Sequence, residues 1–189
     1  MLDLRAKDFV ETQLDPAKPN VPGPTLREAI RKASQPARDE ILERTKEARE
    51  SARSETMANR IVPILRFLIE SDTGNLYHRV HGQLGYALQD LGEFKESDSE
   101  LTQAIQIRDR LRRRGWKYYE LKRAVARIHI DTESPTPLKA RDEILADLRR
   151  AYDEHSDPIS KNREVEVWLK KNGLSIKDIQ PEEKSEASS

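Results

Sequence analysis

Apolar residues recur along most of the chain at the three-to-four residue spacing of amphipathic helices. From Thr25, which has the character of a helix N-cap, to about Glu70, nearly every residue favours helix, and Pro36 marks a break. Residues 57–69 are apolar almost all the way round, which is typical of a buried helix. We therefore expect this segment to be the central element of the fold, with Pro63 kinking it or marking a nearby helix start.

Glycine, proline and short polar clusters divide the rest of the chain. The pattern predicts five further helices, over residues 76–91, 94–111, 116–130, 138–152 and 165–171. Gly173 is placed to end the last of them. Because no stretch sustains the period-two alternation of a strand, the predicted fold class is all-α.

The two ends of the chain differ from this helical middle. Residues 1–24 contain prolines at positions 16, 19, 22 and 24, so we expect an extended or disordered arm there. Residues 176–189 form an acidic tail of small residues, which we expect to be disordered. These boundaries leave residues 25–175 as a single helical domain.

Composition narrows the classes of function. Charged residues make up 36% of the chain and hydrophobic residues 35%, and the 34 Lys+Arg residues balance the 34 Asp+Glu residues. A zero net charge gives no general affinity for nucleic acid or membrane. The absence of cysteine excludes disulfides, thiolate catalysis and cysteine-bound zinc. With no secretory signal pattern and no membrane-spanning run, we expect a cytoplasmic protein without membrane contact.

The most informative motif lies in residues 81–94. A helix carries Leu84 and Gly85, and the chain then turns at Gly92. Small and large residues alternate at helical spacing on the next helix, at Ser97, Leu101, Ala104 and Ile107. A small residue at Gly85 lets the partner helix approach closely, while the leucines fill the space on either side. This pattern resembles the tetratricopeptide repeat.

A second, weaker copy of the pattern follows. Its first helix has Leu121, Ala124, Val125 and Ile128, and its second has Ala140, Ile144 and Leu148. Val125 stands where the family has glycine. The resemblance covers residues 75–152 at most, and it implies antiparallel helical hairpins stacked as a short right-handed superhelix or bundle.

The resemblance also implies a binding groove formed by the first helix of each hairpin. Its register places these residues in the groove: Arg79, Tyr86, Gln89, Asp90, Tyr119, Lys122 and His129. Such a mixed polar and aromatic surface suits a protein or peptide partner, a second copy of the chain included. Alternatively, the protein's own N-terminal arm or terminal helix fills the groove.

A basic cluster provides the main alternative function. Its members are Arg108, Arg110, Arg112, Arg113, Arg114 and Lys117, with Trp116 among them. Arginine beside aromatic rings suits phosphate contacts and base stacking. The same run also suits a solvated helix end. Nucleic acid is therefore the less favoured partner.

Catalytic and metal chemistry have little support in the sequence. His78 and His81 lie one helical turn apart, but two imidazoles without a third ligand make a weak metal site. There is no glycine-rich phosphate loop and no nucleophile elbow. We therefore expect a non-catalytic interaction module or adaptor that needs no cofactor and no metal.

Overall fold

The computed structural model describes residues 1–113, 115–133 and 141–180. Within these ranges every regular element is a helix and no strand occurs, which confirms the all-α prediction. The chain forms two compact units, the N-terminal unit of residues 1–113 and the C-terminal unit of residues 114–189. This division differs from the single domain expected over residues 25–175.

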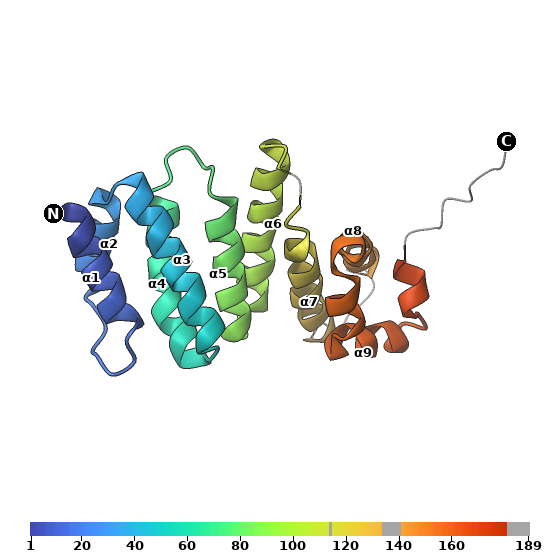
Figure 1. The fold of residues 1–189 in the computed structure, drawn as a ribbon. Coiled ribbons are helices and arrows are strands. Elements are labelled where there is room, and N and C mark those ends of the chain that lie inside the picture. The colour runs from blue at the N-terminus through green and yellow to red at the C-terminus, as the bar shows by residue number, and fades with distance from the viewer. Residues whose placement is uncertain (114, 134–140, 181–189) are drawn as a thin grey trace. The chain divides into compact units, whose positions relative to one another are not determined.

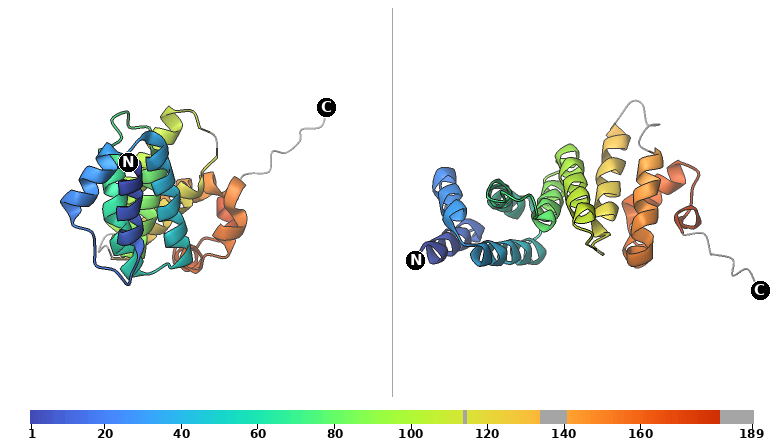
Figure 2. Two further views of the ribbon diagram at one scale, coloured as in Figure 1. Left: turned by 60° about the vertical axis from the view of Figure 1, so that its left-hand side comes forward. Right: turned by 90° about the horizontal axis from the view of Figure 1, so that it is seen from above.

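The N-terminal unit consists of three successive pairs of helices. The pairs are α1 (Leu2–Leu14) with α2 (Gly23–Lys32), α3 (Gln35–Ser51) with α4 (Glu55–Glu70), and α5 (His78–Asp90) with α6 (Phe94–Arg110). Helices α1 and α3 lie next to one another in one layer, and α2 and α4 pack together in a second (Figures 1 and 2). Helix α5 packs against both α3 and α4, and α6 packs against α5.

Residues 1–24 differ from the expected extended arm. Helix α1 occupies most of this segment and buries Ala6, Val10 and Leu14 at a spacing of four residues. The prolines are confined to the connection between α1 and α2 and to the first turn of α2. Arg60 of α4 fixes this connection, because its guanidinium donates to the carbonyl oxygens of Gln13 and Lys18 at 2.9 and 2.7 Å.

The start of α2 also differs from the expected N-cap at Thr25. Pro22 is the N-cap, and Gly23 and Pro24 form the first helical positions. Proline is favoured there because its missing N–H has no intrahelical partner in the first turn. Pro36 likewise lies in the first turn of α3, so it marks a helix start as the sequence indicated.

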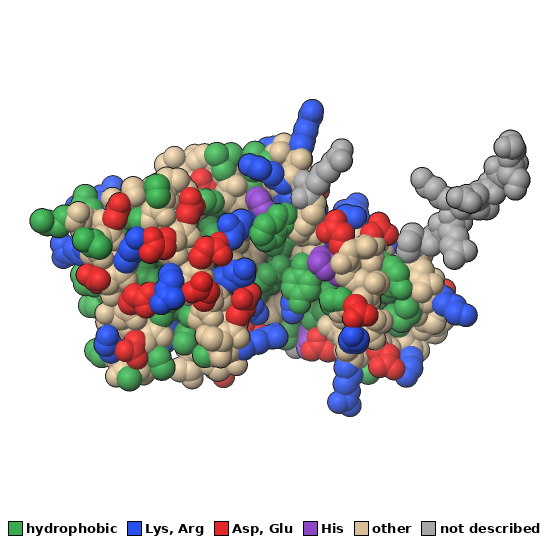
Figure 3. All heavy atoms as spheres, in the orientation of Figure 1, with side chains coloured by type: hydrophobic (Ala, Val, Ile, Leu, Met, Phe, Trp, Pro, Cys, Tyr) green, Lys and Arg blue, Asp and Glu red, His purple; other side chains and the backbone are tan. Residues whose placement is uncertain are grey.

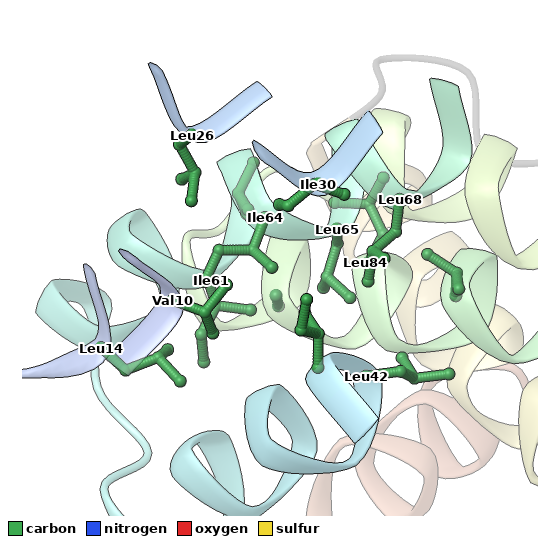
Figure 4. Close-up of a cluster of buried hydrophobic side chains, with 14 of the residues drawn as sticks. Val10, Leu14, Leu26, Ile30, Leu42, Ile61, Ile64, Leu65, Leu68 and Leu84 are labelled. Atoms are coloured by element: carbon green, nitrogen blue, oxygen red, sulfur yellow. The ribbon is translucent and has the colours of Figure 1, made fainter. Parts of the chain in front are cut away.

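Helix α4 is the centre of the N-terminal unit, as residues 57–69 predict. It contacts α1, α2, α3 and α5, and it continues through Pro63. Its side chains Ile61, Ile64, Leu65 and Leu68 are fully buried (Figure 4). Side chains from the surrounding helices complete this core, including Val10, Leu26, Ile30, Leu42 and Leu84. Phe67 and Ile69 are only half-buried, so residues 57–69 are not enclosed along their whole length.

The hairpin of α5 and α6 confirms the predicted close approach at Gly85. A Cβ atom built on Gly85 would lie 2.6 Å from Leu101 Cγ, which is closer than real Cβ contacts. The hydroxyl of Ser97 donates to the Gly85 carbonyl oxygen at 2.9 Å. Gly92 has a φ of +77° at the turn between the helices, where the absence of a Cβ removes the steric cost.

The C-terminal unit contains α7 (Tyr118–Glu133), α8 (Arg141–Ser160), α9 (Arg163–Lys171) and a 3₁₀ turn, η1 (Ile176–Ile179). Helices α7 and α8 pack together and bury the predicted apolar positions of the second copy: Leu121, Ala124, Val125, Ile128, Ile144 and Leu148. Ala140 lies outside the described residues. Helix α8 extends beyond its expected end at Tyr152 and bends at His155, three residues before Pro158.

The end of the C-terminal unit differs from the expected disordered tail. Gly173 has a φ of +68° and follows α9, as predicted for a glycine beyond a helix end. After it, η1 packs on α8 and Ile179 is fully buried. Residues 176–180 are therefore part of the folded unit, and residues 181–189 lie outside the described residues.

A buried ion pair joins α7 to α8. Arg123 Nε and one terminal nitrogen donate to the two carboxylate oxygens of Asp147 at 2.9 and 2.6 Å, and Arg127 approaches the same carboxylate at 3.2 Å. The Asp147 side chain is only 2% exposed. Burial raises the pKa of Asp147, while the two arginines oppose that rise. Losing one partner of such a pair leaves an uncompensated buried charge.

Gly85→Ala is expected to destabilise the protein, because Leu101 is fully buried and has little room to move. Overpacking costs about 1–3 kcal/mol, against about 1 kcal/mol gained in helix propensity. The free energy of unfolding in urea measures this effect. Gly23→Ala is the control variant, since no described atom lies within 4 Å of a Cβ built on Gly23. If Gly85→Ala and Leu101→Ala proved additive in a double-mutant cycle, the proposed contact would be wrong.

Leu65→Ala is expected to lower the free energy of unfolding by about 2–5 kcal/mol, because it leaves a cavity in the α4 core. Phe67→Ala should cost less than Leu65→Ala, since Phe67 is half-buried and packs below the Arg27 guanidinium at 5.1 Å. Asn59→Ala, at an exposed position of the same helix, should change stability by about 0.5 kcal/mol or less. Equal losses for Leu65→Ala and Asn59→Ala would exclude α4 as the core element.

Candidate functional site

The predicted groove positions of α5 are largely covered by α3. The Arg79 guanidinium forms an ion pair with Glu43. Asp90 has a side chain that is only 4% exposed, and Arg53 Nε lies 2.5 Å from its Oδ1. Arg49 Nε lies 2.7 Å from Asp90 Oδ2, although without the alignment of a hydrogen bond. Asp90 is therefore committed to contacts within the protein.

Tyr86 is also enclosed, and this corrects its expected position in an open groove. The residue is only 7% exposed. The Arg49 guanidinium lies 5.4 Å from its ring centroid and donates to the Tyr86 carbonyl oxygen at 3.4 Å. The helical register was predicted correctly, since Leu84 and Leu88 point into the core. The sequence pattern of α5 alone did not reveal that an arginine from α3 and another from the connection after it would cover its other side.

A series of ion pairs crosses the face that carries α1, α3 and α5, and we call it the charge ladder. From α1 to α3 it contains Lys7–Glu40 and Glu11–Arg44, and from α3 to α5 it contains Glu43–Arg79 and Arg49–Asp90. Arg53, in the connection after α3, also contacts Asp90. Acidic and basic side chains are accordingly interspersed over this face in the space-filling view (Figure 3). Exposed pairs of this kind contribute about 0–1 kcal/mol each.

The Tyr77 hydroxyl adds a neutral link from α5 to α3. It donates to Asp39 Oδ1 at 2.6 Å. Burial, followed by the interaction with the Asp39 carboxylate, raises the pKa of Tyr77 above its usual value. The phenol therefore stays protonated and continues to donate through the physiological pH range. The face as a whole is occupied by contacts that join neighbouring helices.

The predicted groove residues of the C-terminal unit lie along α7. Tyr119 is buried at 2% exposure. The Lys122 ammonium lies 5.5 Å from the ring centroid of Tyr118, a distance suited to a cation–π contact. His129 has a different position, since its Nε2 lies 3.1 Å from Glu164 Oε1 of α9 at the edge of a pocket. Of these three residues, His129 lines a pocket of the C-terminal unit.

The basic cluster is partly engaged with neighbouring groups. Arg108 is buried at 5% exposure and forms an ion pair with Asp109 at 2.8 Å. The Arg110 guanidinium donates to the Asn75 carbonyl oxygen. Arg112 and Arg113 are exposed at the end of the N-terminal unit.

The remaining members of the cluster belong to the C-terminal unit. Arg114 lies outside the described residues. Lys117 Nζ lies 3.6 Å from Asp153 and 3.7 Å from Glu154, so acidic side chains offset its charge. Trp116 is 48% exposed and has a φ of +63°. The predicted run thus divides into paired cations and the exposed Arg112 and Arg113.

The pocket between α7 and α9, here called the α7–α9 pocket, has a volume of about 250 Å³. From α7 it is lined by Ile128, His129 and Thr132. From α9 it is lined by Arg163, Glu164, Val167, Trp168 and Lys171. Val167 is one of these lining residues and is 57% exposed, so the pocket presents apolar surface to solvent. Concave sites with apolar walls and a few polar groups at the rim are typical binding sites.

The wall of this pocket is held rigidly. Trp168 is only 1% exposed, and its indole Nε1 donates to Asp131 Oδ2 of α7 at 3.2 Å. Asn162 caps the N-terminus of α9 by accepting from the amides of Glu164 and Val165 at 3.0 and 3.1 Å. These contacts fix the helix that presents Val167.

Two other pockets have charged groups that are already paired. The α1–α2 pocket, with a volume of about 350 Å³, places Arg5 over the Phe9 ring and Lys32 beside Glu28. The pocket between α1 and α3, of about 580 Å³, contains Arg44, which forms ion pairs with Glu11 and Glu47. In the α1–α3 pocket the Arg44 cation is already paired with carboxylates, and in the α1–α2 pocket Arg5 lies over the Phe9 ring.

The role of α9 in this pocket was not predicted from the sequence. Val165, Trp168 and Leu169 are buried, which places Val167 on the opposite, outward side of the helix. In the sequence, the signal for this site is a valine on the polar side of the helix, four residues from both Arg163 and Lys171. Its meaning depended on α7, which supplies the other wall of the pocket and is distant in sequence.

Among the described residues, no three histidine or acidic side chains are grouped to hold a metal ion. His81 Nδ1 lies 2.7 Å from Glu100, while burial, and then the nearby Arg79, Arg108 and Arg113, lower the pKa of His78. In the part of the chain that the structure describes, none of the helices has the length and apolar character needed to cross a bilayer.

Tyr86→Ala is expected to destabilise the protein by about 2–5 kcal/mol, because it removes a buried ring and its contact with Arg49. Lys122→Ala should cost about 1 kcal/mol or less, since it removes a partly exposed cation–π contact. Urea unfolding measures both, and Tyr86→Phe serves as the control that keeps the ring. If Tyr86→Ala lowered the free energy of unfolding by less than about 0.5 kcal/mol, Tyr86 would instead be a solvent-facing groove residue.

Comparison of the whole chain with known proteins finds no family model that matches, no curated protein that matches and no solved structure that matches. The all-α fold therefore rests on the helices described above. Gly85, Ser97 and Leu101 form the close contact of the α5–α6 hairpin.

Proposed function

We propose that this protein is a non-catalytic interaction module that holds a segment of a partner protein in the α7–α9 pocket. The observation that carries the proposal is the combination of an apolar pocket and a half-exposed Val167 on a fixed helix. An exposed apolar side chain in a concave site gains from being covered by a partner. A site with these components favours recognition through packing.

The helical hairpins provide independent support for an interaction role. The α5–α6 hairpin has the small-residue contact of a tetratricopeptide-like unit, and α7 and α8 form a second packed pair. Proteins built from stacked helical hairpins use their extended surfaces to bind other proteins. A short right-handed superhelix of helical hairpins is part of the proposal. The binding site is assigned to α7 and α9, because the charge ladder occupies the corresponding face of α3 and α5.

Val167→Asp is expected to remove partner binding without unfolding the protein. The new carboxylate would lie four residues from both Arg163 and Lys171, a spacing that favours ion pairs along a helix. Affinity capture from cells of the source organism, with quantitative mass spectrometry, should show at least about a tenfold loss of the specific partner. The midpoint of thermal unfolding should stay close to that of the unmodified protein.

Leu76→Asp is the matched control, because Leu76 is 55% exposed and belongs to the N-terminal unit. It should leave capture unchanged. The alternative nucleic-acid function predicts the opposite pattern, with binding lost in Arg112→Ala/Arg113→Ala and falling steeply as salt increases. Full capture by Val167→Asp would rule out the α7–α9 pocket as the binding site.

A further inference from the structure

Three residues form a stripe along the outward side of α9. Arg163, Val167 and Lys171 are separated by four residues each, and all three line the α7–α9 pocket. Four residues advance a helix by about 6 Å and bring the side chain back to nearly the same side. The two cations therefore flank Val167, and their positions on the helix are about 12 Å apart.

The cations of this stripe are less closely paired than Lys170, because the pKa of Glu166 is lowered chiefly by Lys170 and only then by the more distant Arg163. Within the described ranges, neither Arg163 nor Lys171 forms an ion pair, whereas the adjacent Lys170 pairs with Glu166 at 2.7 Å. Arg163 also stands in the first turn of α9, where the positive end of the helix dipole disfavours a cation. Both charges are exposed, and they remain available to a carboxylate supplied from outside.

One acidic residue also lies at the rim. Glu164 Oε1 is 3.1 Å from His129 Nε2, so this carboxylate already contacts a group within the pocket. The Thr132 hydroxyl donates to the His129 carbonyl oxygen at 2.8 Å. The rim groups left for a ligand are therefore Arg163 and Lys171, one at each end of the stripe.

The volume and walls of the pocket limit what enters it. About 250 Å³ accommodates a single large side chain. Ile128 and Trp168 provide apolar walls, but Trp168 is only 1% exposed, so its ring face is not open for stacking on a nucleic-acid base. The site thus favours an aliphatic or aromatic protein side chain over a nucleotide.

We infer that the α7–α9 pocket recognises an acidic segment of a partner protein, in which one large apolar side chain lies between two carboxylates. This inference rests on the proposed function and names the chemistry of the partner. The apolar side chain packs against Val167, and the carboxylates bind Arg163 and Lys171. On a helical partner, the spacing corresponds to acidic residues four positions before and four positions after the apolar one.

The protein's own C-terminal residues do not fit this description. Residues 181–189 contain Glu182, Glu183 and Glu186 but no apolar residue larger than alanine or proline. They would supply charge without the side chain that fills the pocket. Residues 181–189 are therefore not the occupant.

The test uses the full chain and three fluorescein-labelled helical peptides that differ at three positions. The first carries Glu, Leu and Glu at positions i, i+4 and i+8, the second replaces Leu with Ala, and the third replaces both Glu with Lys. Fluorescence anisotropy should show the first peptide binding at least about tenfold more tightly than either of the others. Arg163→Glu/Lys171→Glu should reverse the preference in favour of the third peptide.

Lys161→Glu/Lys177→Glu is the control variant. It makes the same change in net charge at exposed residues outside the pocket, and it should leave the preference unchanged. Equal loss of binding in the control variant would overturn the inference, because the effect would then follow from net charge. Comparable binding of the Leu and Ala peptides would overturn it as well.

Two further results separate this inference from the proposed function. If all peptides with Leu bind equally and Val167→Asp abolishes their binding, the acidic preference is overturned while the pocket remains a protein-binding site. If Val167→Asp leaves peptide binding unchanged, both the inference and the proposed site are wrong. Binding of a single-stranded oligonucleotide that depends on Arg163 and Lys171, or a dimer in light scattering that Val167→Asp dissociates, would replace the acidic segment with another occupant.

Discussion

The broad apolar face of α4 is the contact on which the N-terminal unit depends. It packs against four other helices, α1, α2, α3 and α5, and its side chains Ile61, Ile64, Leu65 and Leu68 provide the fully buried centre. A chain with only 35% hydrophobic residues has few such faces. The remaining helices can therefore be narrow amphipathic elements, each burying a stripe and leaving its polar side in water. This distribution explains how a highly charged sequence forms a packed helical unit.

The charged surface has two different physical roles. On the N-terminal unit, the charge ladder uses arginines, lysines and carboxylates to join neighbouring helices, and Asp90 illustrates how completely such a group can be enclosed. Around the α7–α9 pocket, Arg163 and Lys171 flank apolar surface and are exposed. Opposite charges that are already paired add little to binding, since a ligand must first displace the existing partner. A ligand that binds the exposed cations beside Val167 has no ion-pair partner among the described residues to displace.

The parts of the fold that the sequence predicted are those controlled by local patterns. Leu84, Gly85 and Ser97 indicated the α5–α6 hairpin because their spacing along each helix determines which side chains meet. The second helical pair was predicted for the same reason. The prolines concealed α1, although Ala6, Val10 and Leu14 already had helical spacing. The prediction of an extended arm over residues 1–24 was wrong, because proline restricts only its own backbone and that of the residue before it. The prolines here affect the short connection between α1 and α2 and the first turn of α2.

The candidate site was harder to predict, because it depends on side chains that are distant in sequence. Arg49 and Tyr86 are 37 residues apart, and no pattern within α5 indicates that an arginine covers its tyrosine. Trp168 and Asp131 are likewise 37 residues apart, and their hydrogen bond helps to form a wall of the α7–α9 pocket. His129 was identified from the repeat register, whereas Val167 and its flanking cations emerged only when α7 and α9 were seen together.

The placement of the tryptophans gives the two units separate optical signals. Both tryptophans of the chain, the exposed Trp116 and the buried Trp168, belong to the C-terminal unit. Intrinsic tryptophan emission therefore follows the C-terminal core, while six helices of the N-terminal unit contribute to the far-ultraviolet dichroism without any indole. Because each unit has its own hydrophobic cluster, the two signals need not change at the same temperature. Non-coincident transitions would therefore reveal separate cooperative units within one short polypeptide.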